Sequence, residues 1–296
     1  ECSAGGIAGV ASVGKDLSSG GPMSVTLGTI AKQVGVHEMG HTFGLGHANL
    51  DECPSTSTRC GTGEYLDLFS PMALAVSGAA FTSPALDSGF RSRLGVANAD
   101  EVPLVTLANG SATRSMRLLP RSATSGVRGA EVVDPSSGTH YFVEYRSGTG
   151  RDSSAFYSGT SSLVGVPVDY DPGVTITTLS TDGKLTIESR PTSSRTSGSW
   201  PTGQTFTAPS AAMSVAVTST TSSAADVTVS FPNAPTITTS TPTIAGAVAA
   251  TQKATAVPGT WESGASFTYD WRIDGASTGA TTATYVLPAD AQGKAL

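Results

Sequence analysis

Residues 37–47 read HEMGHTFGLGH, and this stretch decides how the rest of the sequence is interpreted. Positions four residues apart lie on one face of a helix, so a helix here would present the imidazoles of His37 and His41 to a single cation. Gly44 is typical of the left-handed residue that ends a helix, and the turn would let His47 supply a third ligand. Three neutral histidines with one open coordination position are typical of a catalytic Zn²⁺ site. We therefore expect one zinc ion bound by these three histidines.

The glutamate after the first histidine has a different predicted role. Glu38 comes one residue after His37, so it would project beside the metal rather than bind it. A carboxylate in that place can act as general base toward an activated water, which makes Glu38 the predicted catalytic residue. The chain has 4 histidines, and three of them fall in this short stretch. This clustering argues against histidines that merely pack in a core.

The stretch resembles the zinc-binding signature of metzincin metallopeptidases, and a second segment agrees with it. Residues 65–73 read YLDLFSPMA and resemble the Met-turn that lies beneath the metal in that family. The order of tyrosine, aspartate and methionine is most similar to the gametolysin-like branch. The resemblance implies a zinc endopeptidase that cleaves protein or peptide substrates, with Met72 as the hydrophobic floor of its site. It leaves open whether Tyr65 assists an oxyanion and whether Asp67 supports the ligands or only forms the turn.

The sequence also departs from the metzincin pattern. Some metzincins carry a tyrosine two residues after the methionine, where this chain has Leu74. Metzincins usually have a longer upper subdomain before the first histidine, and residues 3–14 would be its end. We therefore expect residues 1–100 to be an N-terminally incomplete α+β catalytic part. Within it the sequence predicts a strand at 6–13 and helices at 28–43 and 84–94, the second helix capped by Ser83.

The remainder of the sequence predicts β domains. Between residues 101 and 232 short apolar runs recur between turn signals, which is typical of a β-sandwich or jelly roll. This range resembles the β-sandwich domain that follows gametolysin-like catalytic domains in bacterial secreted proteases. After a proline-rich linker, residues 236–296 resemble a bacterial immunoglobulin-like module that is C-terminally incomplete, with Trp261 and Trp271 in its core. The predicted fold is therefore multi-domain.

Composition and cysteine usage narrow the class of protein. The net charge is −6 and charged residues make up 14% of the chain, which argues against a nucleic-acid binder. No apolar run approaches the roughly 18 residues of a membrane span. Abundant Ser, Thr, Gly and Ala favour a secreted bacterial protein. Cys53 and Cys60 flank a polar turn and are expected to form a disulfide, with a partner for Cys2 upstream; three free thiols in a cytosolic protein are the alternative.

Two other functions stay open. About two thirds of the chain is predicted β module, which would fit an extracellular adhesion or matrix-binding protein whose metal site is not catalytic. The modules could also target an enzyme to a cell wall or matrix. The HExxH arrangement specifies only activated water, so a hydrolase of non-peptide substrates is a third reading. Asp169 and Asp171 could offer oxygens to Ca²⁺, although a solvated turn explains them as well, and His140 is expected to lie on the surface or in a core rather than bind metal.

Overall fold

The structure is a computed structural model in which the chain forms two compact units, Glu1–Ala234 and Pro235–Leu296. Both units are built mostly of β-sheet, which agrees with the all-β texture predicted for residues 101–232 and 236–296. Cys2, Cys53, Cys60 and Trp261 lie outside the described residues. The structure describes residues 8–52, 61–77, 81–107, 112–192, 195–232, 241–246, 248–259 and 267–296.

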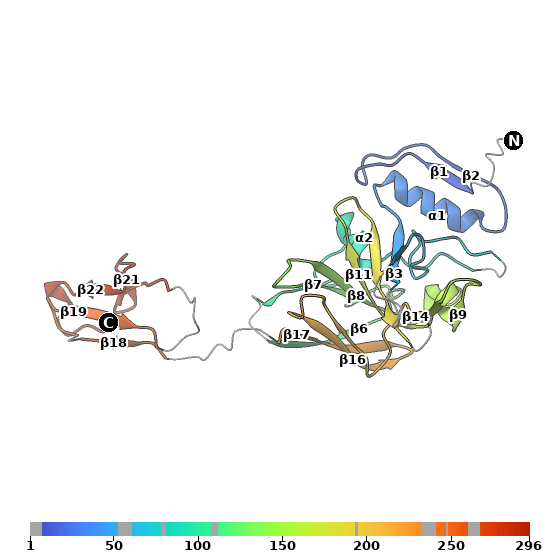
Figure 1. The fold of residues 1–296 in the computed structure, drawn as a ribbon. Coiled ribbons are helices and arrows are strands. Elements are labelled where there is room, and N and C mark those ends of the chain that lie inside the picture. Colours follow the sequence, from blue (N-terminus) through green and yellow to red (C-terminus); the bar gives the residue numbers. More distant parts are fainter. Residues whose placement is uncertain are drawn as a thin grey trace. The chain divides into compact units, whose positions relative to one another are not determined.

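A seven-stranded sheet is the centre of the first unit (Figure 1). Its order is β4-β3-β12-β11-β8-β7-β5, and β3 pairs in parallel with β12 while β11 and β8 are antiparallel. The strands are β3 (Ala48–Glu52), β4 (Gly61–Gly63), β5 (Leu104–Val105), β7 (Gly129–Val133), β8 (His140–Arg146), β11 (Gly173–Leu179) and β12 (Leu185–Glu188).

A second, four-stranded sheet faces one side of this central sheet. Alternate residues of β8 point to opposite sides, so Tyr141, Val143 and Tyr145 share a core with the second sheet. The other face of β8 is covered by α2 (Ser88–Arg93) and by loops. The second sheet has the order β15 (Thr205–Thr207), β16 (Ser214–Thr221), β17 (Ala224–Ser230) and β6 (Thr113–Leu118). A smaller sheet consists of β13 (Arg190–Pro191), β14 (Thr196–Ser197), β10 (Val168–Tyr170) and β9 (Ser161–Ser162).

The two ranges predicted as separate domains, 1–100 and 101–232, share this architecture. Strand β3 comes from the first range and β12 from the second, and they pair from Leu185 with Ala48 to Glu188 with Asp51. Pairing between residues so far apart in sequence leaves no local signal, because each strand alone is a short mixed run. The central sheet therefore joins the histidine segment to the β-rich part.

A hairpin and the long helix complete the first unit. The helix α1 (Ala31–Thr42) lies within the predicted range 28–43. Strand β1 (Gly9–Ala11) pairs with β2 (Met23–Val25), and both strands contact α1. Gly9 permits this approach, because a Cβ there would lie 2.6 Å from Oε1 of Glu38. The hairpin therefore covers the helix face that carries the predicted base.

The second predicted helix begins later than expected. It begins at Ser88 with Asp87 as N-cap residue, and not at Pro84 with Ser83 as the cap. Asp152 accepts a hydrogen bond from the Ala85 amide at 2.9 Å, and Arg146 donates to the Ala85 carbonyl at 2.7 Å. These bonds hold the preceding segment out of helical geometry. The predicted end of this helix is confirmed, since Gly95 has φ +68°.

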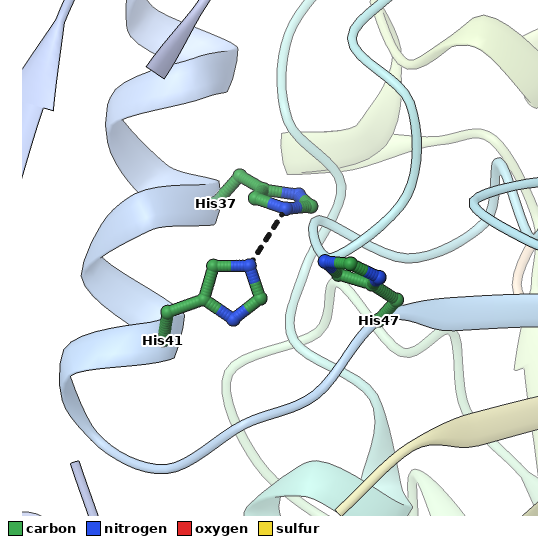
Figure 2. Close-up of side chains that lie close together, drawn as sticks. All are labelled: His37, His41 and His47. Atoms are coloured by element: carbon green, nitrogen blue, oxygen red, sulfur yellow. Dashed lines mark hydrogen bonds between the residues drawn. The ribbon is translucent and has the colours of Figure 1, made fainter. Parts of the chain in front are cut away.

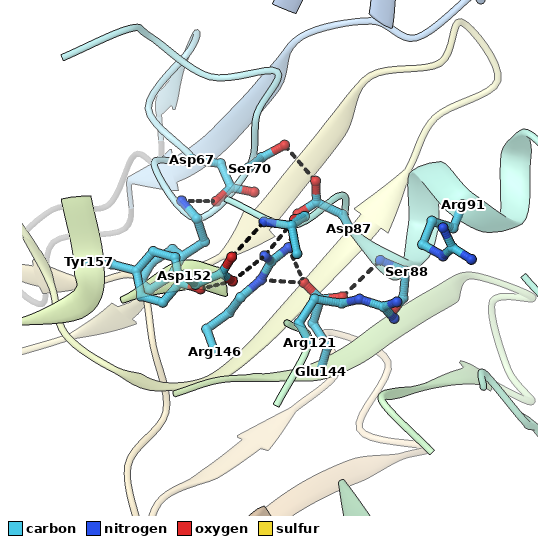
Figure 3. A network of polar contacts seen from close by, with 12 residues as sticks. Asp67, Ser70, Asp87, Ser88, Arg91, Arg121, Glu144, Arg146, Asp152 and Tyr157 are labelled. Carbon is cyan, nitrogen blue, oxygen red and sulfur yellow. Dashed lines mark hydrogen bonds and ion pairs between the residues drawn. The ribbon is translucent and has the colours of Figure 1, made fainter. Parts of the chain in front are cut away.

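A buried ionic network around Arg146 lies on the face of β8 that α2 and loops cover (Figure 3). Arg146 is fully buried, and its guanidinium lies 2.7 Å from the Asp87 carboxylate and also contacts Glu144. Asp87 in turn accepts a hydrogen bond of 2.6 Å from Ser70, and Asp152 accepts one of 2.5 Å from Tyr157. The network links four segments of the chain: the loop of residues 65–73, the loop before α2, strand β8 and residues 152–157.

Replacing Arg146 by alanine should destabilise the chain by about 3–5 kcal/mol, because three buried carboxylates would lose their cation. Urea denaturation measures the change. Arg117→Ala is the matched control: Arg117 pairs with Asp226 at an exposed position, and its loss should cost less than about 1 kcal/mol. Equal effects of the two substitutions would contradict this account of the network.

The second unit is a small β module with its own core. Its sheet runs β18 (Thr243–Ala245), β19 (Lys253–Val257) and β22 (Thr284–Val286), with a separate pair β20 (Arg272–Ile273) and β21 (Ala276–Ser277). Trp271 is buried, donates its indole N–H to the Thr282 carbonyl at 2.8 Å and stacks on Tyr285. The predicted core role of Trp271 is therefore confirmed. In the part of the chain that the structure describes, no helix has the length and apolarity needed to cross a membrane.

Candidate metal centre

Helix α1 fixes the first two histidines of the motif. His37 and His41 are one turn apart on α1, and their ring centroids are 4.7 Å apart. The helix ends at Thr42, and two residues later Gly44 has φ +84°, while the amide of Leu45 donates to the Gly40 carbonyl at 3.0 Å. A Cβ on Gly44 would also lie 2.8 Å from the Lys15 backbone, so only glycine fits this turn.

The central sheet fixes the third histidine. His47 immediately precedes β3, and its carbonyl accepts a hydrogen bond of 3.0 Å from the Leu185 amide of β12. One residue earlier, the Gly46 amide donates to the Gly183 carbonyl at 2.8 Å. A turn after α1 and a parallel strand pair thus carry His47 back toward the helix.

The three imidazoles converge on one point (Figure 2). One ring nitrogen from each of His37, His41 and His47 lies within 4.8 Å of the others. The Nε2 atoms of His37 and His41 are 3.1 Å apart. Around a tetrahedral zinc with Zn–N bonds of about 2.0–2.1 Å, two ligand nitrogens are separated by about 3.3–3.4 Å. The observed spacing therefore suits one small cation.

Backbone carbonyls determine which nitrogen faces that point. Nδ1 of His37 lies 3.1 Å from the Ala73 carbonyl, and Nδ1 of His41 lies 2.8 Å from the Leu45 carbonyl. A carbonyl can only accept, so each Nδ1 carries the proton and each neutral Nε2 presents a lone pair. Two lone pairs 3.1 Å apart have no hydrogen between them, and a shared cation would satisfy both. The donor set therefore fits a metal ion.

Burial keeps the deepest histidine neutral. Burial and the two neighbouring imidazoles lower the pKa of His37 to about 4. At neutral pH this side chain is therefore available as a neutral ligand, as metal binding requires.

The predicted base lies beside the cluster. Glu38 is buried on α1 and lines a cavity of about 310 Å³ together with His37, Tyr65 and Leu74. Burial raises the pKa of the Glu38 carboxyl above its usual value, and the nearby histidines oppose that shift. A carboxylate with a raised pKa is a stronger proton acceptor than an exposed one. Glu38 thus shares a cavity with the candidate ligands.

The methionine of the second segment lies beneath the helix. Met72 is fully buried, and a Cβ on Gly40 would lie 2.2 Å from its sulfur. The Met72 carbonyl accepts a hydrogen bond of 3.0 Å from the Ala48 amide at the start of β3. Met72 therefore contacts both structural elements that carry the histidines, which is where a floor residue is expected.

Asp67 lies in the same loop and is completely buried. Its Oδ1 accepts a hydrogen bond from the Phe69 amide, while Oδ2 has no partner among the described residues. Burial and the nearby Asp87 carboxylate raise the pKa of Asp67 well above its usual value of 3.8. The raised pKa favours the neutral form of Asp67, which suits a residue of the loop rather than a charged ligand.

The sequence did not predict one polar partner of the cluster, and two other residues considered as metal ligands lie outside it. Glu64 accepts a hydrogen bond of 2.6 Å from Nδ1 of His47, a contact that no spacing in the sequence indicates. His140 pairs instead with Glu131 and lies outside the cluster. Asp169 accepts a hydrogen bond from Arg195, and among the described residues no group of three potential metal ligands includes it.

Comparisons with protein families, with curated proteins and with solved structures each find no match to this chain. The geometry itself supports a group of three histidines that could hold a metal ion, compatible with zinc without being specific for it. The histidine cluster is therefore the structural observation that bears on function.

The cluster predicts that the chain binds one zinc ion. His41→Ala should weaken zinc binding by more than the roughly 10–100-fold that loss of an outer partner costs, because it removes a ligand. Competition with a chromophoric chelator measures the affinity. His140→Ala is the matched control and should bind zinc as the parent does, whereas equal losses for both would place the ion elsewhere.

Asp67→Asn should change how stability depends on pH. Because its pKa is raised in the folded state, folded Asp67 keeps a proton that the unfolded chain releases, so stability falls as the pH rises above about 4. Asparagine keeps the acceptor for Phe69 and removes this loss. Urea denaturation at about pH 5 and about pH 8 should show the variant gaining stability relative to the parent as pH rises. Parallel curves would contradict the assignment, and exposed Asp100→Asn is the control.

Proposed function

We propose that the chain is the catalytic part and following β-rich part of a secreted zinc endopeptidase of the metzincin type, most similar to the gametolysin-like branch. One observation carries the proposal: three imidazole lone pairs converge beside the buried carboxylate of Glu38. The HEMGHTFGLGH sequence and the Met72 segment support the family assignment by resemblance. Sparse charge and abundant small polar residues support secretion.

The three histidines would hold the ion, and the chain's own groups would manage the proton. The group contains His37, His41 and His47 and no fourth histidine, cysteine or carboxylate among the described residues, which would leave a coordination position for water or substrate. Bound zinc would polarise a substrate carbonyl and lower the pKa of a water toward about 7. No further ligand from the chain is needed for this chemistry.

Glu38 would act as the general base and then as the general acid. It accepts a proton from water as the water oxygen bonds to the scissile carbonyl carbon. It then donates that proton to the amide nitrogen as the C–N bond breaks, so protons balance across the reaction. Its position in the cavity beside His37 suits both transfers, and its burial suits the first.

Glu38→Gln should lower hydrolysis of a denatured protein substrate such as casein by about 10²–10⁴-fold, because the amide cannot accept the proton. Zinc binding should persist, since Glu38 is not among the three clustered ligands. Substrate cleavage and metal content are measured on the same samples, with Glu131→Gln as a control that should remain active. Retained cleavage with zinc bound would overturn the proposal, and zinc binding without cleavage by the parent chain would favour a matrix-binding role.

A further inference from the structure

His47 differs from the other two clustered histidines in the group that holds it. Backbone carbonyls accept from Nδ1 of His37 and His41, whereas Nδ1 of His47 lies 2.6 Å from a side-chain oxygen, Oε1 of Glu64. An ionised carboxylate only accepts hydrogen bonds, so this contact also requires the proton on Nδ1. It leaves Nε2 of His47 as the nitrogen that can face the cation.

A second contact lies on the face of the same imidazole. The Tyr65 ring centroid is 3.9 Å from that of His47, with an interplanar angle of 35°. The carboxylate therefore holds the edge of the His47 ring while the tyrosine covers one of its faces. Two neighbouring residues in sequence act on a single side chain.

The backbone of Tyr65 is what allows this arrangement. Tyr65 has φ +64°, a left-handed conformation that costs a non-glycine residue about 1–3 kcal/mol. Successive side chains of an extended chain point to opposite sides, so Glu64 and Tyr65 would diverge if the strand continued. The left-handed residue directs both toward His47.

Hydrogen bonds hold that conformation in place. The Tyr65 amide donates to Oδ1 of Asn49 at 3.1 Å, and the Tyr65 carbonyl accepts from the Leu74 amide at 2.9 Å. Asn49 belongs to β3, the strand that begins next to His47, and Leu74 follows the Met72 segment. The surrounding structure therefore fixes the turn at both ends, as a strained residue with a positional role requires.

We propose that Glu64 and Tyr65 are positioning residues for the metal site, and that they set the tautomer and the ring orientation of His47. The inference rests on the proposed metal-binding function. Backbone carbonyls hold the imidazoles of His37 and His41, whereas the His47 imidazole is held by side chains and without them would lose rotational freedom on binding the ion. A carboxylate on the distal nitrogen also makes the imidazole a stronger ligand. The pair thus supplies for His47 what the Ala73 and Leu45 carbonyls supply for the other two histidines.

The test measures the zinc affinity of the full chain by chelator competition. Glu64→Ala should weaken binding by about 10–100-fold. Glu64→Gln should restore most of the affinity, because its amide oxygen can still accept the Nδ1 proton. Glu131→Ala removes the same kind of bond, 2.5 Å from His140, and should leave zinc affinity unchanged. Equal affinity of Glu64→Ala and the parent would overturn the inference.

Tyr65 variants separate positioning from support of the fold. Tyr65→Phe keeps the ring over His47 and should bind zinc as the parent does. Tyr65→Gly suits the positive φ, so the metal-free variant should unfold at about the same urea concentration as the parent, yet bind zinc more weakly. Unchanged zinc affinity of Tyr65→Gly would remove Tyr65 from the proposal.

Cobalt substitution gives a readout other than affinity or activity. The visible absorption of the Co²⁺-loaded chain reports ligand geometry, and Glu64→Ala should shift it while Glu131→Ala should not. These measurements distinguish a failure of the proposed function from a failure of this inference. A parent chain that binds neither Zn²⁺ nor Co²⁺ would overturn both the proposed function and this inference, whereas a parent that binds zinc and cleaves protein beside an unaffected Glu64→Ala variant would overturn the inference alone.

Discussion

The convergence of three imidazole lone pairs is the constraint on which the rest of this structure depends. Like dipoles 3.1 Å apart repel in the absence of a cation, so the fold has to hold them there by other means. It does so with a helix for two ligands and a sheet strand for the third, and with an acceptor on every Nδ1. Because those acceptors are fixed, a bound ion would find its ligands already oriented.

The same constraint explains why the candidate metal centre is not confined to the residues around the motif. His47 receives a backbone hydrogen bond from β12, and the loop of residues 65–73 is tied through Ser70 to Asp87 and Arg146. Arg146 is the last residue of β8, an inner strand of the central sheet. The β-rich part of the first unit therefore helps to hold the three histidines in place.

Local patterns predicted the features that depend on neighbours in sequence. The i, i+4 spacing of His37 and His41 and the glycine at 44 indicated the helix and its end, and α1 and its C-terminal turn agree with both. The return of His47 toward the helix followed from the same turn. These features need only the helix period and the conformational freedom of one glycine.

The features that were missed depend on residues far apart in the chain. Nothing near β3 indicates that its partner is β12, more than 130 positions later. Helix α2 begins later than predicted because the buried side chains of Asp152 and Arg146 form hydrogen bonds with the backbone of Ala85. Glu64 could be found only once the backbone of Tyr65 was known to be left-handed. Buried ion pairs and long-range strand pairing produce no periodic pattern in the sequence from which they could be predicted.

The central claim is that one ion touches all three histidines, and X-ray absorption at the zinc edge tests it most directly. For the zinc-loaded chain the account predicts three imidazole nitrogens at about 2.0–2.1 Å, with the remaining coordination from oxygen of a non-protein ligand. A shell containing sulfur, or one with fewer than three imidazoles, would contradict it.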